Sequence, residues 1–504
     1  MYTLCINIIV AGYVMNHKEA LELYNSGPET VVKYLCEIHA QLEAVQKQVK
    51  TLQEQLQKNS RNSSKPPSSD GFKKPKRSGV NEHRKKRKGK KRKPGGQKGH
   101  KGFGLTAVEK PDQIKVHKVC KCKNCKRSLE DVAATEYEAR QVFDIPPIEP
   151  ETTEHRAEIK DCPDCNERNK AEFPEDVKGP VQYGPRIKAI AVYMKNYQLL
   201  PYKRTCELFK DIFTIDIVEG TLVNINKDCS KRLELTMEEI REALKGAPVS
   251  HFDETGCSVE GKRIWLHVAS TPEFTYFEIH DKRGREAMDD IGILPDFKGR
   301  AIHDFWKSYL VYDCDHGLCN AHLLRELIFL YEEQNQCWAE NMIDCLLDIK
   351  EAVDKAKDNG KNTLDNATTK KIEKDYDAII EAGLAENPIL KTSPKNKKGK
   401  RKRGRIKKTK AQNLLCRFRD YKKEVLAFMY DFQVPFDNNL AERDLRMMKV
   451  QQKISGTFRS REGSKHFCQI RSYISTIRKN AKNVIDSIRK IFLGTPSIIS
   501  PDTS

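Results

Sequence analysis

Near the N-terminus, apolar residues recur at alternating spacings of four and three, with Gln, Glu and Lys between them. The series comprises Val31, Leu35, Ile38, Leu42, Val45, Val49, Leu52 and Leu56. This is the a/d seam of a coiled coil, and a single amphipathic helix packed on the body of the protein is the alternative. The polar NSSKPPSSDG segment that follows leaves little protein nearby to pack against. We therefore predict a coiled coil over residues 25–58 that makes the chain a homo-oligomer, after an N-terminal tail over 1–24.

A second pattern, alternation of apolar and polar residues, begins near residue 248 and is typical of half-buried strands. It predicts three strands joined by short turns and, after a helix, a fourth strand, over residues 248–258, 262–271, 273–280 and 299–306, with the helix over about 284–292. Alternation places Asp253 on one face of the first strand and Glu254 on the other. Asp304 lies near the end of the fourth strand.

A helical period appears in FDNNLAERDLRMMKV, residues 436–450. Asn439, Glu442, Arg446 and Lys449 share one side of the predicted helix, and the opposite side is apolar. Glu followed by Arg four residues later is ordinarily an exposed ion pair of small energy. The acids on the upstream strands favour another interpretation, in which the helix holds the Glu442 carboxylate rigidly as part of a site.

Asp253, Asp304 and Glu442 thus lie on a strand, a strand end and a late helix. That order is the plan of a ribonuclease H-like domain, so we predict a multidomain α/β protein with such a catalytic core. A two-metal phosphoryl-transfer site needs several oxygen ligands around ions roughly 3.5–4 Å apart, and Mg²⁺ suits carboxylate ligands. The predicted core covers residues 245–480, with a helical insertion at about 325–432 and a C-terminal tail over 481–504.

Two cysteine pairs have metal-ligand spacing. Four of the 16 cysteines form pairs with two residues between partners: Cys122, Cys125, Cys162 and Cys165. Four thiolates in two such pairs strongly favour a structural Zn²⁺, with a redox dithiol as the alternative for one pair. We predict a zinc-binding module over 113–176, in which strands over 138–146 and 152–160 form a hairpin, and Cys120 is a spare thiol that could compete as a ligand.

The positive charge of the chain is concentrated in two runs. Residues 71–110 hold 16 Lys and Arg against 2 Glu, and residues 395–410 hold 11 and no acid, in a chain of net charge +20. Such runs bind phosphates by counterion release, and a solubilising linker or a nuclear import signal is the alternative. The first run lies in a predicted basic disordered linker over 59–112. Sequence-specific DNA contacts are expected from a helix-turn-helix-like segment over 177–244.

The chain resembles the transposases of the insertion sequence sixty-six family, which belong to the DDE class. The matching motifs follow one another in order, and besides the paired cysteines they are GPETVVKYL, NSSKPPSSDG, KPGGQKGHKG, LPYKRTCELFKDIF, EGTLVN, HFDETG, CNAHLLREL, KRGR, NLLCRF, VPFDNNLAERDLRMMKVQQKISGTFRS and RSYISTIRKN. The resemblance implies that Asp253, Asp304 and Glu442 are the catalytic acids and bind Mg²⁺ or Mn²⁺. It also implies accessory proteins encoded beside the transposase.

The resemblance adds Cys319 and His322 in CNAHLLREL as residues of a secondary site. At i and i+3 near a helix start, they could buttress the active site or contact DNA, whereas a buried Cys beside a hydrogen-bonded His is the structural alternative. Asn439, Arg446 and Lys449 are expected to contact the DNA backbone beside Glu442.

We therefore predict a DNA transposase that binds the ends of an insertion sequence and catalyses metal-dependent strand cleavage and strand transfer. The alternative is a catalytically silent, zinc-containing DNA-binding regulator, in which the acids are structural. The apolar residues 1–14 are too short to span a bilayer and no other run has membrane length, so we expect a soluble cytoplasmic protein of a bacterium, associated with the nucleoid.

Overall fold

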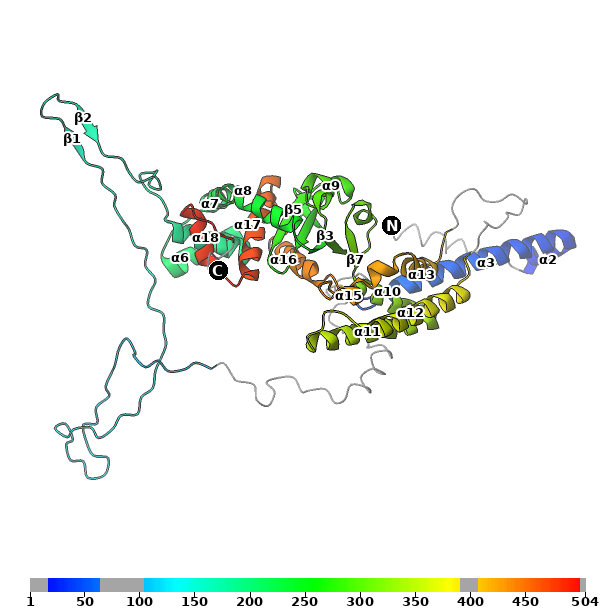
Figure 1. The fold of residues 1–504 in the computed structure, drawn as a ribbon, viewed down its shortest axis with the longest axis horizontal. Coiled ribbons are helices and arrows are strands. Elements are labelled where there is room, and N and C mark those ends of the chain that lie inside the picture. Colours follow the sequence, from blue (N-terminus) through cyan, green and yellow to red (C-terminus); the bar gives the residue numbers. More distant parts are fainter. Residues whose placement is uncertain (1–16, 64–103, 390–406, 499–504) are drawn as a thin grey trace. The chain divides into compact units, whose positions relative to one another are not determined.

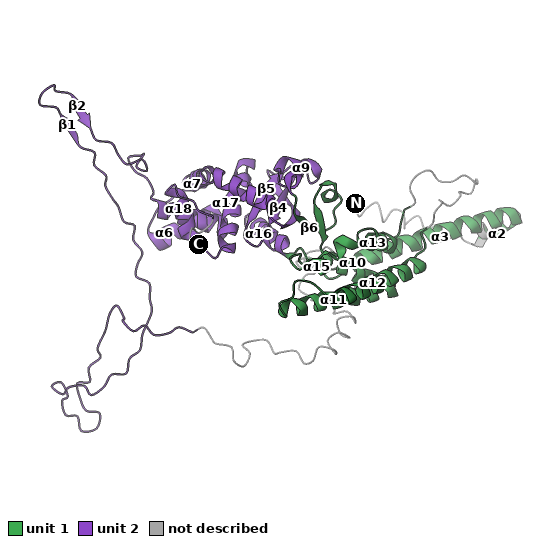
Figure 2. Ribbon diagram, in the orientation of Figure 1, with its two compact units in different colours: residues 1–80, 298–439 green, residues 81–297, 440–504 purple. Residues whose placement is uncertain are grey.

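The computed structural model describes residues 17–63, 104–389 and 407–498. The chain forms two compact units, and each combines segments that are distant in sequence (Figure 2). Unit 1 comprises residues 1–80 and 298–439, and unit 2 comprises residues 81–297 and 440–504. Helices and strands both contribute, which confirms the predicted mixed α/β class.

Unit 2 contains the predicted three-stranded meander. Its strands are β3 (Val249–Val259), β4 (Lys262–Ser270) and β5 (Thr275–His280), paired antiparallel in that order. Glu260 and Gly261 join β3 to β4 with φ angles of 53° and 75°. A two-residue turn with both central φ angles positive suits the right-handed twist of a hairpin, so the sequence Glu-Gly fixes the register here.

Helices surround this meander in the order of the chain. They are α5 (Pro185–Val192), the π-helix η2 (Tyr193–Tyr197), α6 (Tyr202–Phe213), α7 (Glu219–Arg232), α8 (Glu234–Lys245), α9 (Arg285–Ile291), the 3₁₀ helix η3 (Leu294–Asp296), α16 (Asn439–Ser455), α17 (Arg461–Lys479) and α18 (Val484–Phe492). α16 begins at the last residue of the unit 1 range and otherwise belongs to unit 2. Its apolar side, with Leu445 and Met448, shares a core cluster with Leu266 and Val268 of β4.

α17 covers the edge strand β5 (Figure 1). The Ser472 hydroxyl accepts the Phe277 N–H at 2.8 Å, and the Thr476 hydroxyl accepts the Thr275 N–H at 3.1 Å. Because Ser472 and Thr476 are four residues apart, they lie on one side of the helix and meet alternate N–H groups of the strand. The edge of the meander is therefore satisfied by side chains where a further strand would otherwise pair.

Unit 1 contains a parallel strand pair and a group of helices. Its elements are α2 (His17–Asn25), α3 (Pro28–Leu56), β6 (Arg300–His303), the 3₁₀ helix η4 (Tyr309–Val311), β7 (Asp315–Leu318), α10 (Asn320–Gln334), α11 (Cys337–Asp358), α12 (Asn366–Glu386), α13 (Lys410–Asp420), α14 (Lys422–Val425) and α15 (Ala427–Tyr430). α11 and α12 pack side by side (Figure 1). Helices thus fill the segment where a helical insertion is predicted.

The helix predicted near the N-terminus is present as α3, and its apolar stripe is exposed. No residue of α3 is buried, and Leu35, Ile38, Leu42 and Val45 are 43–59% exposed. Only the C-terminal end of the helix is tied to the rest of unit 1. Glu54 pairs with Lys410 at 2.7 Å on α13.

Several boundaries differ from the prediction. The C-terminal tail is wrong, because α18 buries Ile488, Ile491 and Phe492 and packs on α5. The N-terminal tail contains α2, and β7 has no counterpart among the predicted strands. The strands predicted over 138–146 and 152–160 are also wrong, apart from the last two residues, Ile159 and Lys160. These residues are almost all exposed, so no buried face fixes their pairing.

None of the described helices is both long enough and apolar enough to cross a membrane. The apolar residues 1–14 and most of the two basic runs lie outside the described residues.

Candidate active site and metal-binding residues

Asp253 lies on β3, and the structure separates it from the neighbouring acid Glu254. Glu254 is buried, with 1% of its side chain exposed, and Arg283 donates to its Oε1 from Nε and Nη2 at 2.8 and 2.6 Å. Asp253 is only half-buried, and its Oδ1 accepts the Glu254 N–H at 2.9 Å. Of the two acids in HFDETG, the one on the Arg283 side is neutralised inside the protein, and Asp253 is the better candidate ligand.

The same division occurs on α16, which carries Glu442 in its first turn. Asp444 accepts a hydrogen bond from the Thr275 hydroxyl at 3.1 Å and from the Lys479 ammonium at 2.8 Å. The Lys479 ammonium also donates to the carbonyls of Thr271 and Phe274 at 2.8 and 3.0 Å. Asp444 is thus held in a buried ion pair, and the half-buried Glu442 is the acid of this helix that suits a ligand role.

Lys479 was not identified from the sequence as a site residue, although it ends the motif RSYISTIRKN. It fastens α16 to the loop between β4 and β5 only two residues beyond Glu442. Burial lowers the pKa of Lys479, and the Asp444 carboxylate opposes that shift. The signal that could have found it is a lysine at the end of an otherwise apolar helix face.

The three side chains expected to contact DNA differ in their surroundings. Asn439 and Arg446 are exposed, at the start and in the middle of α16. Lys449 is also exposed, but its ammonium donates to the Gly256 carbonyl of β3 at 2.8 Å, and partial burial lowers its pKa. Lys449 therefore joins the helix to the strand that carries Asp253, and its role toward DNA remains a prediction.

Asp304 follows β6 in unit 1, at the strand end that the sequence predicts. Its Oδ1 accepts the Trp306 N–H at 2.9 Å, which closes a short turn. The intervening Phe305 has a φ of 74°, a left-handed conformation that costs a bulky residue free energy. His303 before it is buried, and its Nδ1 lies 3.1 Å from the Phe305 backbone nitrogen. The backbone on both sides of Asp304 is thereby held in one conformation.

Cys319 and His322 lie at the start of α10 in unit 1. Cys319 precedes the helix and is buried, and its sulfur accepts the Asn438 N–H at 3.2 Å. The first helical residue, Asn320, donates from its backbone to the Phe436 carbonyl at 3.1 Å. These contacts hold the chain that leads into α16. His322 lies on the other side and lines a pocket of the unit.

Each cysteine pair forms the same local turn. Cys122 and Cys162 each accept the N–H of the residue four positions later, at 3.1 and 2.9 Å, through their carbonyls. Those later residues, Lys126 and Asn166, have positive φ angles of 62° and 57°. Backbone N–H groups, chiefly that of the second cysteine of each pair, lower the pKa of Cys122 and Cys162.

Such a turn favours the thiolate, which is the form that binds Zn²⁺, so both pairs fit the predicted ligand type. The second pair lies in the hairpin of β1 (Ile159–Asp161) and β2 (Arg168–Lys170). In the described part of the chain, the four thiols do not gather into one cluster of ligand atoms. A shared zinc site for Cys122, Cys125, Cys162 and Cys165 remains a prediction.

The helix pair expected to read DNA consists of α6 and α7, separated by residues 214–218. Thr214 ends α6 in the left-handed conformation, with φ of 58°. α7 buries Leu222, Ile225 and Cys229 against the rest of unit 2 and leaves Val223 and Lys227 exposed. Two helices with a short link are therefore present as predicted, and their role in sequence recognition remains a prediction.

Comparison with known proteins identifies the family. A family described as "Transposase IS66 family" matches residues 180–466, and a family of unknown function (DUF6444) matches residues 19–106. No curated protein matches the chain. The first match covers more than half of the 504 residues and includes Asp253, Asp304 and Glu442. The chain therefore belongs to the Transposase IS66 family.

Proposed function

We propose that the protein is a DDE-type DNA transposase that binds the ends of an insertion sequence and catalyses metal-dependent strand cleavage and strand transfer. Family membership supports a transposase role, with DNA as the partner. The observation that carries the finer proposal is that the family match contains all three acids, on a strand, a strand end and a helix. A ribonuclease H-like core is proposed on the same basis, because three antiparallel strands, a helix and a further strand follow one another along the chain.

The proposed metal ligands are Asp253, Asp304 and Glu442. Carboxylate oxygens are the ligands that Mg²⁺ or Mn²⁺ prefers, and bound metal ions would activate the attacking oxygen and stabilise the leaving oxygen. Backbone N–H groups orient the carboxylates of Asp253 and Asp304, each through Oδ1 at 2.9 Å. Glu254 and Asp444 are neutralised by buried cations, so they position the elements that carry the ligands.

The roles of the other residues follow from their contacts. Cys319 supports the segment that enters α16, in line with a buttressing role. Asn439 and Arg446 are proposed to contact DNA phosphates, since both are exposed on α16 beside Glu442. α6 and α7 are proposed to bind the element ends. The two cysteine pairs are proposed to hold one structural Zn²⁺ when their turns come together, because each turn stabilises a thiolate.

Self-association through α3 is part of the proposal, because strand transfer joins two DNA ends and needs both to be held. The exposed heptad positions of α3 lack any covering element in the described part of unit 1, and a second copy of the same helix supplies a complementary stripe.

Metal-dependent strand transfer with purified element ends tests the catalytic assignment. Glu442→Gln keeps the size of the side chain and removes its charge, so it should abolish joining in Mg²⁺ and leave end binding nearly unchanged. Glu386→Gln, at the end of α12, is the matched control and should join DNA like the unaltered protein. Joining by Glu442→Gln would sink the site assignment. Absence of joining by the unaltered protein, with end binding retained, would favour the regulator.

A further inference from the structure

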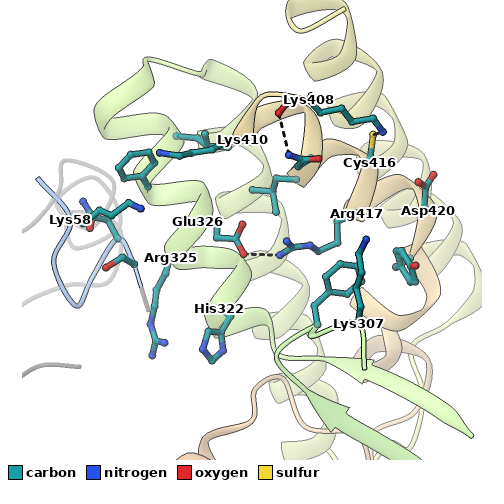
Figure 3. Close-up of a pocket in the computed structure, with 18 residues that line it drawn as sticks. Lys58, Lys307, His322, Arg325, Glu326, Lys408, Lys410, Cys416, Arg417 and Asp420 are labelled. Atoms are coloured by element: carbon teal, nitrogen blue, oxygen red, sulfur yellow. Dashed lines mark hydrogen bonds and ion pairs between the residues drawn. The ribbon is translucent and has the colours of Figure 1, made fainter. Parts of the chain in front are cut away.

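Unit 1 contains a pocket with an unusual lining. It has a volume of about 620 Å³ and lies between α10, α13, the turn after Asp304 and residues 58–63 (Figure 3). Six cationic side chains line it, against the two carboxylates of Glu326 and Asp420. They are Lys58, Lys307, Arg325, Lys408, Lys410 and Arg417. We call this site the basic pocket.

The balance of charge in the basic pocket favours an anion. Six cations against two carboxylates leave four positive charges, and three remain when Glu54, which pairs with Lys410 from outside the lining, is counted. Arg417 is paired with Glu326 at 2.6 Å (Figure 3). A concave surface with an excess of one sign of charge focuses the electric field and attracts the opposite charge.

Aromatic rings hold two of these cations in place. The Lys410 ammonium lies 4.4 Å from the centre of the Phe329 ring, and the Arg417 guanidinium lies 4.4 Å from that of Phe305. Tyr421 meets Phe305 edge to face at 4.8 Å and is half-buried, so part of its ring borders the pocket. Positioned cations beside an accessible aromatic ring are the features that single-stranded nucleic acids recognise.

The sequence on either side of the pocket points to the same partner. The lining residue Ser63 is followed closely by the basic run 71–110, and the lining residue Lys408 belongs to the basic run 395–410. Both concentrations of positive charge in the chain therefore join the folded unit at this pocket. A phosphate backbone that follows either run would be led to it.

We propose that the basic pocket binds an unpaired nucleotide of a DNA strand, with its phosphates on Lys307 and Lys408 and its base against Tyr421. The volume of about 620 Å³ lies in the range of roughly 300–1,000 Å³ typical of small-molecule sites, so a nucleotide fits where a duplex does not. The pocket begins three residues after Asp304 and includes His322. The inference deepens the proposed function, on which it rests, by assigning a strand-binding site to the helical insertion.

The first test measures binding of a labelled 12-nucleotide single strand to the full chain by fluorescence anisotropy, from 50 to 300 mM NaCl and without Mg²⁺. The double variant Lys307→Gln, Lys408→Gln should bind roughly tenfold more weakly at low salt. Its slope of log affinity against log salt should be shallower by about 1.4, since each phosphate contact on a single strand contributes about 0.7.

The matched control removes two charges from an exposed surface of the same unit. Lys370→Gln with Lys374→Gln lies on α12 outside the pocket and should bind within about twofold of the unaltered protein. Equal weakening by both double variants would overturn the proposal, because binding would then follow net charge alone. Thermal unfolding of each variant confirms that it is folded.

A second test separates a nucleotide from other anions. Tyr421→Ala should weaken single-strand binding roughly tenfold through lost stacking and change duplex binding less than twofold, whereas Tyr421→Phe should retain both. Equal loss toward strand and duplex would refute a base contact. Displacement of the strand by inorganic phosphate as effectively as by deoxyadenosine monophosphate would mark a general phosphate site and overturn the assignment.

These measurements are independent of catalysis. Glu442→Gln should bind the single strand like the unaltered protein, because Glu442 does not line the pocket. If the pocket variants lose strand binding while Glu442→Gln still joins DNA, the catalytic assignment fails and the pocket stands. If Glu442→Gln is inactive while the pocket variants bind normally, the pocket fails and the catalytic assignment stands.

Discussion

Replacement of Lys479 by Met should destabilise unit 2 by removing the cation beside Asp444. The side chains of Lys479 and Asp444 are 13% and 17% exposed and lie 2.8 Å apart. The ammonium also satisfies the carbonyls of Thr271 and Phe274. The variant therefore leaves a carboxylate with hydroxyl donors only and two carbonyls without this donor.

The magnitude follows from these contacts. Breaking a buried ion pair by removal of one partner costs about 3–5 kcal/mol. Because both side chains retain some exposure, water compensates in part, and we expect about 3 kcal/mol. At roughly 2–4 °C per kcal/mol for a domain of this size class, the Tm should fall by about 6–12 °C.

The assay must resolve unit 2 within a chain of two units, since a single two-state fit does not apply. Hydrogen exchange at the amides of Thr275 and Phe277 reports on this region, because side chains of α17 accept both N–H groups. Lys479→Met should accelerate exchange at these amides far more than in α11. It should also lower strand transfer, since Asp444 lies two residues from Glu442.

The double variant Asp444→Asn, Lys479→Met is the control. It removes both charges and leaves no uncompensated carboxylate, so it should recover at least half of the stability lost in the single variant. A loss of less than about 0.5 kcal/mol in Lys479→Met would refute the reasoning, because the pair would then behave as an exposed one.

Three further predictions concern packing, metal and assembly. Gly383→Ala on α12 should destabilise unit 1 by about 1–3 kcal/mol in thermal unfolding, because the added Cβ would lie 2.5 Å from Leu415 Cδ2, whereas Gly220→Ala on α7 meets nothing within 4 Å and should be neutral or stabilising. Cys122→Ser or Cys162→Ser should abolish bound zinc by elemental analysis, with Cys120→Ser as the control that retains it; retention of zinc by the first two would contradict the four-thiolate site. Leu42→Glu should convert an oligomer to monomer in light scattering and leave the Tm of unit 1 unchanged at low concentration, since Leu42 is 53% exposed within the chain; an unchanged mass would exclude the stripe as the interface.

The elements that could be predicted are those with strong local signals. The alternation in residues 249–280 and the Glu260-Gly261 turn gave the meander, because a turn with two positive φ angles leaves one register. The segment over 138–158 also alternates but forms no strand, since nothing covers it. α18 was missed because nine residues with an apolar side count as a helix only when a partner such as α5 buries them.

For the candidate site, the sequence by itself determined the family and the three acids, because each acid lies in a motif of fixed spacing. It also determined where the positive charge is concentrated. Only the tertiary structure decided which neighbouring acids are structural. Period-two alternation separates Asp253 from Glu254 but does not tell which face is buried, and the contact with Arg283 settles it.

The basic pocket and the Lys479 contact arise in the same way, from residues far apart in the chain. Lys58, Lys307 and Lys410 meet in one pocket, and Lys479 meets Asp444 on another helix. Local periodicity carries no information on such distances, because it reports which side of an element is apolar and not which element covers it. The sequence therefore determined the chemistry available to this protein, and the packing of its helices decided which charges are neutralised and which line a site.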